Sequence, residues 1–78
     1  MHLEILTPEK KLFDGDITGV KLPGVIGSFE ILNNHAPIIS ALSKGEIRIN
    51  GSEGTQKFQI NSGFVEGSNN EITVLIEE

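Results

Sequence analysis

Two histidines and scattered carboxylates are the residues of this chain that could take part in acid–base or metal chemistry. A catalytic base must lie beside a substrate, and a metal site needs several ligands that converge. His2 and His35 lie far apart in the sequence and form no pair with the HxxxH spacing of a helical metal site. The chain has no cysteine, so disulfides and thiolate-bound zinc are excluded. Each histidine must therefore be judged by its own surroundings.

His2 could contact Asp14 or Asp16 if the segments that carry them pair as neighbouring strands. We favour the simpler interpretation, a solvated imidazole near the chain terminus. The segment Asp14-Gly15-Asp16 is typical of a turn and lacks the further oxygen ligands of a calcium loop. The sequence therefore predicts no metal site.

His35 lies in the segment NNHAP, residues 33–37, whose asparagines tolerate a left-handed backbone. We interpret it as a turn histidine that hydrogen-bonds to nearby backbone. A small hydrolase could use it as a general base with Glu30 or Glu46, but no serine nucleophile elbow or paired acid accompanies it. We therefore predict no catalytic residue.

The segment GVIG, residues 24–27, is a glycine-flanked turn. It has neither the GxGxxG nor the Gly-Lys-Ser/Thr pattern, and no helix is expected after it, so no phosphate-binding loop and no cofactor are predicted. Val25 and Ile26 are apolar where a turn should be polar. They either fold back onto the core or form an exposed contact surface for a partner protein.

Short strands must position all of these residues. Nine glycines and three prolines interrupt the chain every few residues, which leaves no window for a stable helix. Apolar and polar residues alternate at 46–50, 56–61 and 71–76, and weaker strands are expected at 2–6, 11–14, 16–22, 28–32, 38–42 and 63–66. Turn residues at 51–54 and 67–70 predict hairpins. The prediction is an all-β fold, a small antiparallel β-sandwich of about eight to ten short strands forming one domain over residues 1–78.

Two details of the strand pattern carry further expectations. The apolar phase shifts across Gly19, which indicates a bulge or a bend there. Phe58 and Ile60 are expected to line the core, since they share one face of an alternating strand.

The charge and the hydropathy of the chain exclude several classes of partner. The formal net charge of −5 repels a phosphate backbone, so we predict no nucleic-acid partner. No stretch approaches the roughly 18 apolar residues of a membrane span, and no basic leader precedes the first apolar stretch, so no direct membrane insertion is expected. With no catalytic group in view, no small-molecule substrate is expected either.

A resemblance emerges from an ordered series of segments: GVIGSFEILNNHAP at 24–37, LSKGEIRI at 42–49, SGFVE at 62–66 and ITVL at 72–75. In this order and spacing they resemble the N-terminal β-sandwich of the epsilon subunit of F-type ATP synthases, the counterpart of mitochondrial delta. The resemblance implies a non-catalytic rotor subunit of the central stalk, which couples the gamma subunit to the c-ring in proton-driven ATP synthesis. It also implies a peripheral position at the cytoplasmic face of the cell membrane.

The resemblance also assigns contact residues. Those on the c-ring side are Ser28, Glu30, Asn33 and Asn34, and those on the gamma side are His35, Ala36, Pro37 and Ile38. Relatives often carry Glu at the place of Ser28 and Gly at the place of Glu30, which suggests that an acidic contact has moved here.

Many relatives continue into a helical hairpin that restrains ATP hydrolysis and in some cases binds ATP, whereas this chain ends at Glu78. If it is complete, no hairpin-based inhibition is expected. The alternative function is a free-standing β-sandwich module that binds a protein or a ligand through an exposed edge or loop.

Overall fold

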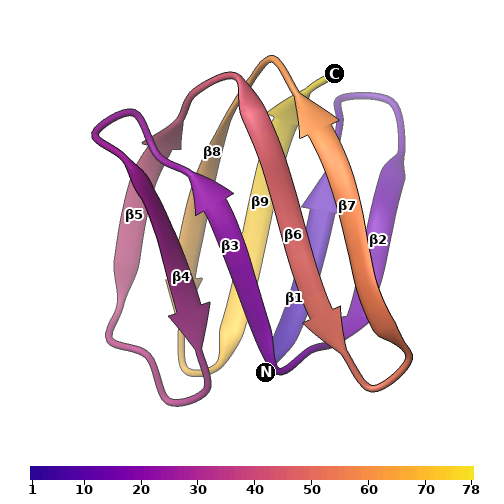
Figure 1. The fold of residues 1–78 in the computed structure, drawn as a ribbon, viewed down its shortest axis with the longest axis vertical. Coiled ribbons are helices and arrows are strands. Elements are labelled where there is room, and N and C mark those ends of the chain that lie inside the picture. The colour runs from indigo at the N-terminus through magenta and orange to yellow at the C-terminus, as the bar shows by residue number, and fades with distance from the viewer.

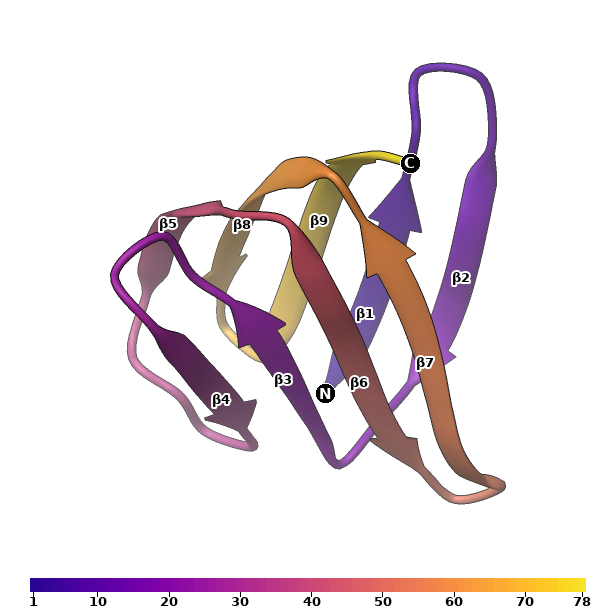
Figure 2. The same ribbon diagram turned by 45° about the horizontal axis from the view of Figure 1, so that its top comes forward.

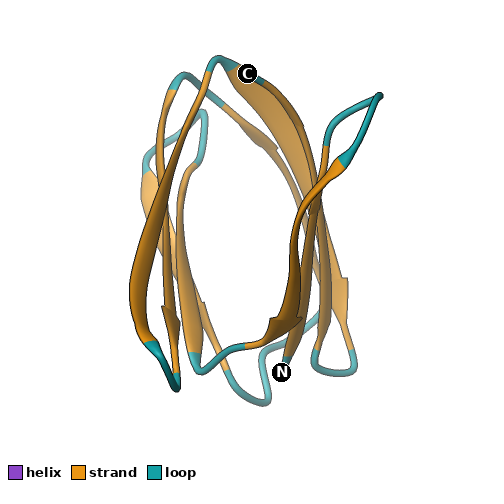
Figure 3. Cartoon of the chain, turned by 90° about the vertical axis from the view of Figure 1, so that its right-hand side faces the viewer, coloured by secondary structure: helices purple, strands orange, loops and turns teal.

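A computed structural model describes residues 1–78 as nine β-strands without a helix (Figure 1). The strands are β1 (His2–Leu6), β2 (Lys11–Asp16), β3 (Gly19–Pro23), β4 (Ser28–Leu32), β5 (Ile38–Leu42), β6 (Gly45–Gly51), β7 (Gly54–Ile60), β8 (Ser62–Ser68) and β9 (Glu71–Glu77). They form a five-stranded sheet, ordered β2-β1-β9-β8-β5, and a four-stranded sheet, ordered β4-β3-β6-β7. Figure 3 shows the two sheets in profile as the layers of a sandwich. The predicted all-β sandwich is confirmed.

Every strand pairing is antiparallel except that of β1 with β9, which is parallel. Almost the whole chain separates β1 from β9, so no hairpin fixes their relative direction. None of the elements is a helix that is long and apolar enough to cross a membrane.

The core lies between the sheets and is purely aliphatic. Fourteen buried residues form one cluster, and no polar or charged residue is buried. Alternation explains this, because every second residue of a strand faces inward: β6 contributes Ile47 and Ile49, for example. Ile60 is buried and Phe58 packs half-buried against the cluster, so the predicted phase of β7 is confirmed.

The bend expected near Gly19 is a crossover between the sheets. β2 ends at Asp16 in the five-stranded sheet, and β3 begins at Gly19 in the four-stranded sheet. The linking Ile17 is buried, as is Val20 after the crossover. The pairing of β3 with β6 is regular from Gly19 onward, so no bulge is needed there. The two residues bury their side chains out of phase because the chain changes sheets between them.

The tight turns carry the backbone angles that their residue types allow. In the β6–β7 hairpin Gly54 has φ 110°, and in the β8–β9 hairpin Asn69 and Asn70 have φ 52° and 59°. Glycine and asparagine tolerate positive φ at the lowest cost. Both predicted hairpins are therefore confirmed.

The two sheets leave two open sides, each bordered by one edge strand from each sheet. β2 and β7 border one side, and β4 and β5 border the other (Figure 2). The loop of residues 33–37 crosses from β4 in one sheet to β5 in the other. It carries most of the contact residues assigned from the sequence.

Candidate partner-binding surface

His35 is held by its own turn. Its Nδ1–H donates a hydrogen bond to the carbonyl oxygen of Ala36 at 2.9 Å, because a carbonyl can only accept. Its Nε2 is buried and has no partner within the chain. The ring packs on Gly67, where an added Cβ would lie 3.2 Å from the His35 Cε1. The Nδ1 is hydrogen-bonded to backbone and the Nε2 is shielded from solvent, so neither ring nitrogen can reach a substrate. The interpretation as a turn histidine is confirmed.

Six of the eight predicted contact residues surround one hollow of about 370 Å³ between β4 and the start of β5. They are Glu30, Asn33, His35, Ala36, Pro37 and Ile38. The residues assigned to two different partners thus share one continuous surface.

The other two predicted residues lie beside this hollow or away from it. The backbone N–H of Asn34 donates to the Asn70 Oδ1 at 2.7 Å, and the Asn70 Nδ2 donates to the Asn34 Oδ1 at 3.2 Å. This pair ties the loop to the β8–β9 turn. Ser28 lies at the opposite end of β4 and lines a separate hollow with Lys21 and Lys44.

Val25 and Ile26 form the exposed tip of the β3–β4 hairpin. Their exposed fractions are 60% and 100%, so the possibility that they fold back onto the core is wrong. The turn at their base is tight, because a Cβ at Gly24 would lie 2.7 Å from the carbonyl oxygen of Gly27. The tip is therefore an exposed apolar surface, and its contact with a partner protein stays a prediction.

A second apolar surface, absent from the sequence-based prediction, crosses the outer face of the five-stranded sheet. Leu6, Leu75, Phe64 and Ala41 stand opposite one another on four neighbouring strands. We call them the apolar row. Its central members Leu75 and Phe64 are 52% and 45% exposed, and a hollow of about 500 Å³ lies along Leu6, Phe64 and Leu75. An exposed row of this kind on a sheet is typical of a protein–protein contact.

The sequence did hold a signal for the apolar row. In Val74-Leu75-Ile76 and Phe64-Val65 the alternation of apolar and polar residues breaks, which places Leu75 and Phe64 on the outer face of β9 and β8. A strand with one wet face would carry a polar residue at these positions.

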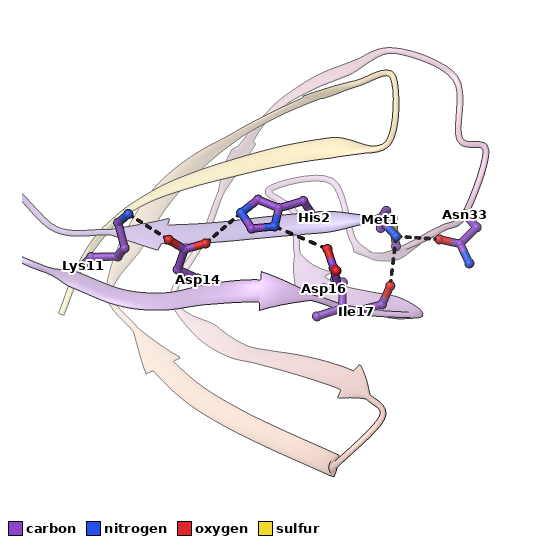
Figure 4. Close-up of polar contacts among 7 residues, drawn as sticks. All are labelled: Met1, His2, Lys11, Asp14, Asp16, Ile17 and Asn33. Carbon is purple, nitrogen blue, oxygen red and sulfur yellow. Dashed lines mark hydrogen bonds and ion pairs between the residues drawn. The ribbon is translucent and has the colours of Figure 1, made fainter.

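A polar cluster lies on β1 and β2, at one edge of the same sheet (Figure 4). The His2 Nε2 lies 2.7 Å from the Asp14 Oδ1, and the His2 Nδ1 lies 3.4 Å from the Asp16 Oδ1. The Lys11 Nζ lies 3.0 Å from the Glu4 Oε2 and 2.9 Å from the Asp14 Oδ2. The interpretation of His2 as an isolated solvated imidazole is therefore wrong, since register places it between two carboxylates.

This cluster joins strands and does not favour a metal. Ligand atoms of His2, Glu4 and Asp14 lie within 4.8 Å of one another. The ammonium of Lys11 already contacts both carboxylates and neutralises part of their charge. The network ties the edge strand β2 to β1, and its exposed ion pairs are of the modest kind found on surfaces.

Acid is expected to weaken this network. The hydrogen bond from Lys11 holds the pKa of Asp14 below its usual 3.8, with a smaller effect from the charge of His2. A lowered folded-state pKa gives stability that is present above about pH 4 and is lost as pH falls through the folded value. The urea midpoint of Asp14→Asn should therefore lie below that of the unchanged chain at pH 7, and the gap should close toward pH 2. A gap of equal size at both pH values would contradict this, and Glu53→Gln in the β6–β7 turn is the control.

The architecture defines the class of protein: a small β-sandwich without a helix, with apolar side chains exposed on its surface. Residues 1–78 match the family model described as ATP synthase, Delta/Epsilon chain, beta-sandwich domain, and the chain belongs to this family. The ATP synthase epsilon chain of Chlorobium limicola is 42% identical over 77 residues, covering 97% of this chain and 88% of the relative. That of Pelotomaculum thermopropionicum is 41% identical over 74 residues, covering 95% of this chain and 55% of the relative.

Solved structures share the fold. The chain superimposes with a TM-score of 0.82 on a chain in the Tetrahymena thermophila mitochondrial ATP synthase central stalk and c-ring, at 19% identity, covering 99% of this chain and 63% of that one. For the Euglena gracilis mitochondrial ATP synthase the TM-score is 0.90 at 14% identity, covering 97% of this chain and 49% of that one. The family assignment from the sequence is confirmed by the family model and the relatives.

Proposed function

We propose that this domain works in the central stalk of an ATP synthase, where it couples the gamma subunit to the c-ring during proton-driven ATP synthesis. The observation that carries the proposal is the family match over residues 1–78. The domain makes and breaks no bond itself. As part of the complex it is membrane-associated, and we place it at the cytoplasmic face of the cell membrane.

The interior suits a part that transmits torque. All 14 core residues are aliphatic and packed into one cluster between two hydrogen-bonded sheets. Close-packed interiors have low compressibility and transmit strain with little loss. A body of this kind passes rotation between its partners without deforming.

The domain has two contact surfaces, and we assign each to a different partner. The apolar row on the five-stranded sheet is flanked by Glu4, Glu66 and Glu77, an apolar centre with an acidic rim that fits a partner surface edged with basic residues. A hollow lined by Pro37, Ile38 and Glu66 connects the acidic rim of the row to the loop assigned to gamma, so we assign the row to gamma as well. Ser28, Glu30, Asn33 and Asn34, together with the hairpin tip, are assigned to the c-ring.

The test is to mix the purified domain with the gamma subunit from the same genome and to follow the pair by size-exclusion chromatography with light scattering. A one-to-one complex supports the proposal. Two separate peaks, with both proteins folded by circular dichroism, would refute it and favour the free-standing binding module.

Ile26→Asp should weaken assembly with the partners without changing the stability of the isolated domain. Its side chain is 100% exposed, so the urea midpoint of the isolated domain should stay within experimental error. Association with the assembled gamma and c-ring should weaken by about tenfold, since one apolar contact is replaced by a charge. Pull-down of the rotor by tagged domain measures this, with Ile26→Val as control. Full association of Ile26→Asp would exclude the tip from the interface.

A further inference from the structure

The positive charges of this acidic chain gather on one face. Four of its six Lys and Arg residues are Lys21, Lys44, Arg48 and Lys57. Lys21, Arg48 and Lys57 lie on β3, β6 and β7 and point outward from the four-stranded sheet, because their strand neighbours face the core. Lys44 directly precedes β6. A chain with a net charge of −5 thus presents a cationic face.

This arrangement works against the stability of the sheet. Lys21 stands directly opposite Arg48, and Arg48 stands directly opposite Lys57. Like charges at opposed positions of neighbouring strands repel and destabilise the pairing. These three opposed cations do not stabilise the sheet, so their placement indicates a role other than stabilising the fold.

Glu30 of β4 stands directly opposite Lys21, but no ion pair within the chain joins a carboxylate to any of these cations. All ion pairs of the structure involve His2 or Lys11, and none involves Lys21, Lys44, Arg48 or Lys57. Lys11 on the other sheet contacts two carboxylates at 2.9 and 3.0 Å, which shows how lysine is paired elsewhere in the same molecule. The cationic face is left free for a ligand.

A hollow of about 430 Å³ lies within this face, at the base of the β3–β4 hairpin. Its lining includes Lys21, Lys44 and Arg48 with Ser28, and no hydrophobic residue. Glu46 is the only carboxylate in the lining, and it accepts a hydrogen bond from the Gln59 Nε2 at 3.4 Å instead of pairing with a cation. The lining carries three positive charges against one negative charge, together with hydroxyl donors.

We propose that the outer face of the four-stranded sheet binds phosphate groups, in the hollow between Lys21, Lys44 and Arg48. The planar guanidinium of Arg48 suits two phosphate oxygens at once, and the two ammonium groups supply compact point charges from either side. Lys57 extends the site for a second phosphate. This site lies on the opposite sheet from the apolar row assigned to gamma, and it shares Ser28 with the surface assigned to the c-ring. The phosphate probes below need neither partner, so the proposal and the rotor function are tested separately.

Two sources present this chemistry, a free polyphosphate and a phospholipid headgroup. The first arm of the test titrates the isotope-labelled domain with pyrophosphate at constant ionic strength and follows backbone amides by NMR. Saturable shifts should appear at Gly24, Ser28 and Lys44. The second arm measures co-sedimentation with phosphatidylglycerol vesicles against phosphatidylcholine vesicles at the same ionic strength.

Matched variants decide whether the hollow is the site. Arg48→Ala and Lys21→Ala should each weaken binding by about tenfold, because each removes a charge-assisted hydrogen bond. Lys10→Ala removes the same charge from the exposed β1–β2 turn and should have no effect. Saturable pyrophosphate binding lost in the variants supports a free phosphate ligand. Vesicle binding alone, lost in the same variants, supports a lipid headgroup.

The proposal is overturned if neither probe binds, or if Lys10→Ala weakens binding as much as Arg48→Ala. A folding readout adds a second criterion. Lys57→Glu places a carboxylate opposite Arg48, so it should raise the urea midpoint while weakening pyrophosphate or vesicle binding. A lowered midpoint would mean that the cations stabilise the fold, which contradicts a ligand-binding role.

Discussion

Ile5→Ala is expected to unfold most of the domain, whereas Ile26→Ala should leave it folded. Both changes remove the same atoms, but Ile5 is 0% exposed and Ile26 is 100% exposed. Ile5 lies in β1 between Phe13 of β2 and Val74 of β9, so its truncation opens a cavity where three strands meet. Such changes cost about 2–5 kcal/mol. A chain of 78 residues has a total stability of only about 4–12 kcal/mol.

Urea unfolding followed by circular dichroism measures this prediction. The midpoint of Ile5→Ala should fall steeply, or the variant should be unfolded in buffer, while the exposed control should change by less than about 0.5 kcal/mol. Equal midpoints for the two variants would mean that β1 does not face the core as the structure places it.

The strands with alternating apolar and polar residues could be predicted from the sequence, because one of their faces is exposed to solvent. Glu46 and Arg48 bracket Ile47, and this pattern gives the phase and the burial of β6 without further information. The hairpin turns follow equally from local chemistry, since Gly54 and Asn70 accept positive φ. Local rules were sufficient wherever the cause was local.

The contacts between distant segments could not be predicted in the same way. The pairing of β1 with β9 and the position of His2 between Asp14 and Asp16 depend on which strands become neighbours, which the local pattern does not encode. The cationic face has in part the same origin: Arg48 and Lys57 face each other across the β6–β7 hairpin, but only sheet order places Lys21 beside Arg48. Strand order is a property of the whole packed chain.

Leu75→Lys is expected to abolish one-to-one association with gamma while leaving the domain folded. Leu75 is 52% exposed at the centre of the apolar row, between Leu6 and Phe64. A lysine there keeps an aliphatic stem against these neighbours in the free domain, and its ammonium can reach water. In the complex the same ammonium would be buried against an apolar centre, and a buried unpaired charge is among the costliest changes in an interface.

The loss of affinity should be about 100-fold or more, since the substitution removes a central apolar contact and desolvates a charge. Light scattering of the mixed proteins, followed by titration calorimetry, measures it. Gln59→Lys adds the same charge to the outer face of the four-stranded sheet and should leave association with gamma unchanged. Binding by Leu75→Lys equal to that of the control would remove the apolar row from the gamma interface. The loop of residues 33–37 and the hairpin tip would then be the surfaces left to hold the domain in the stalk.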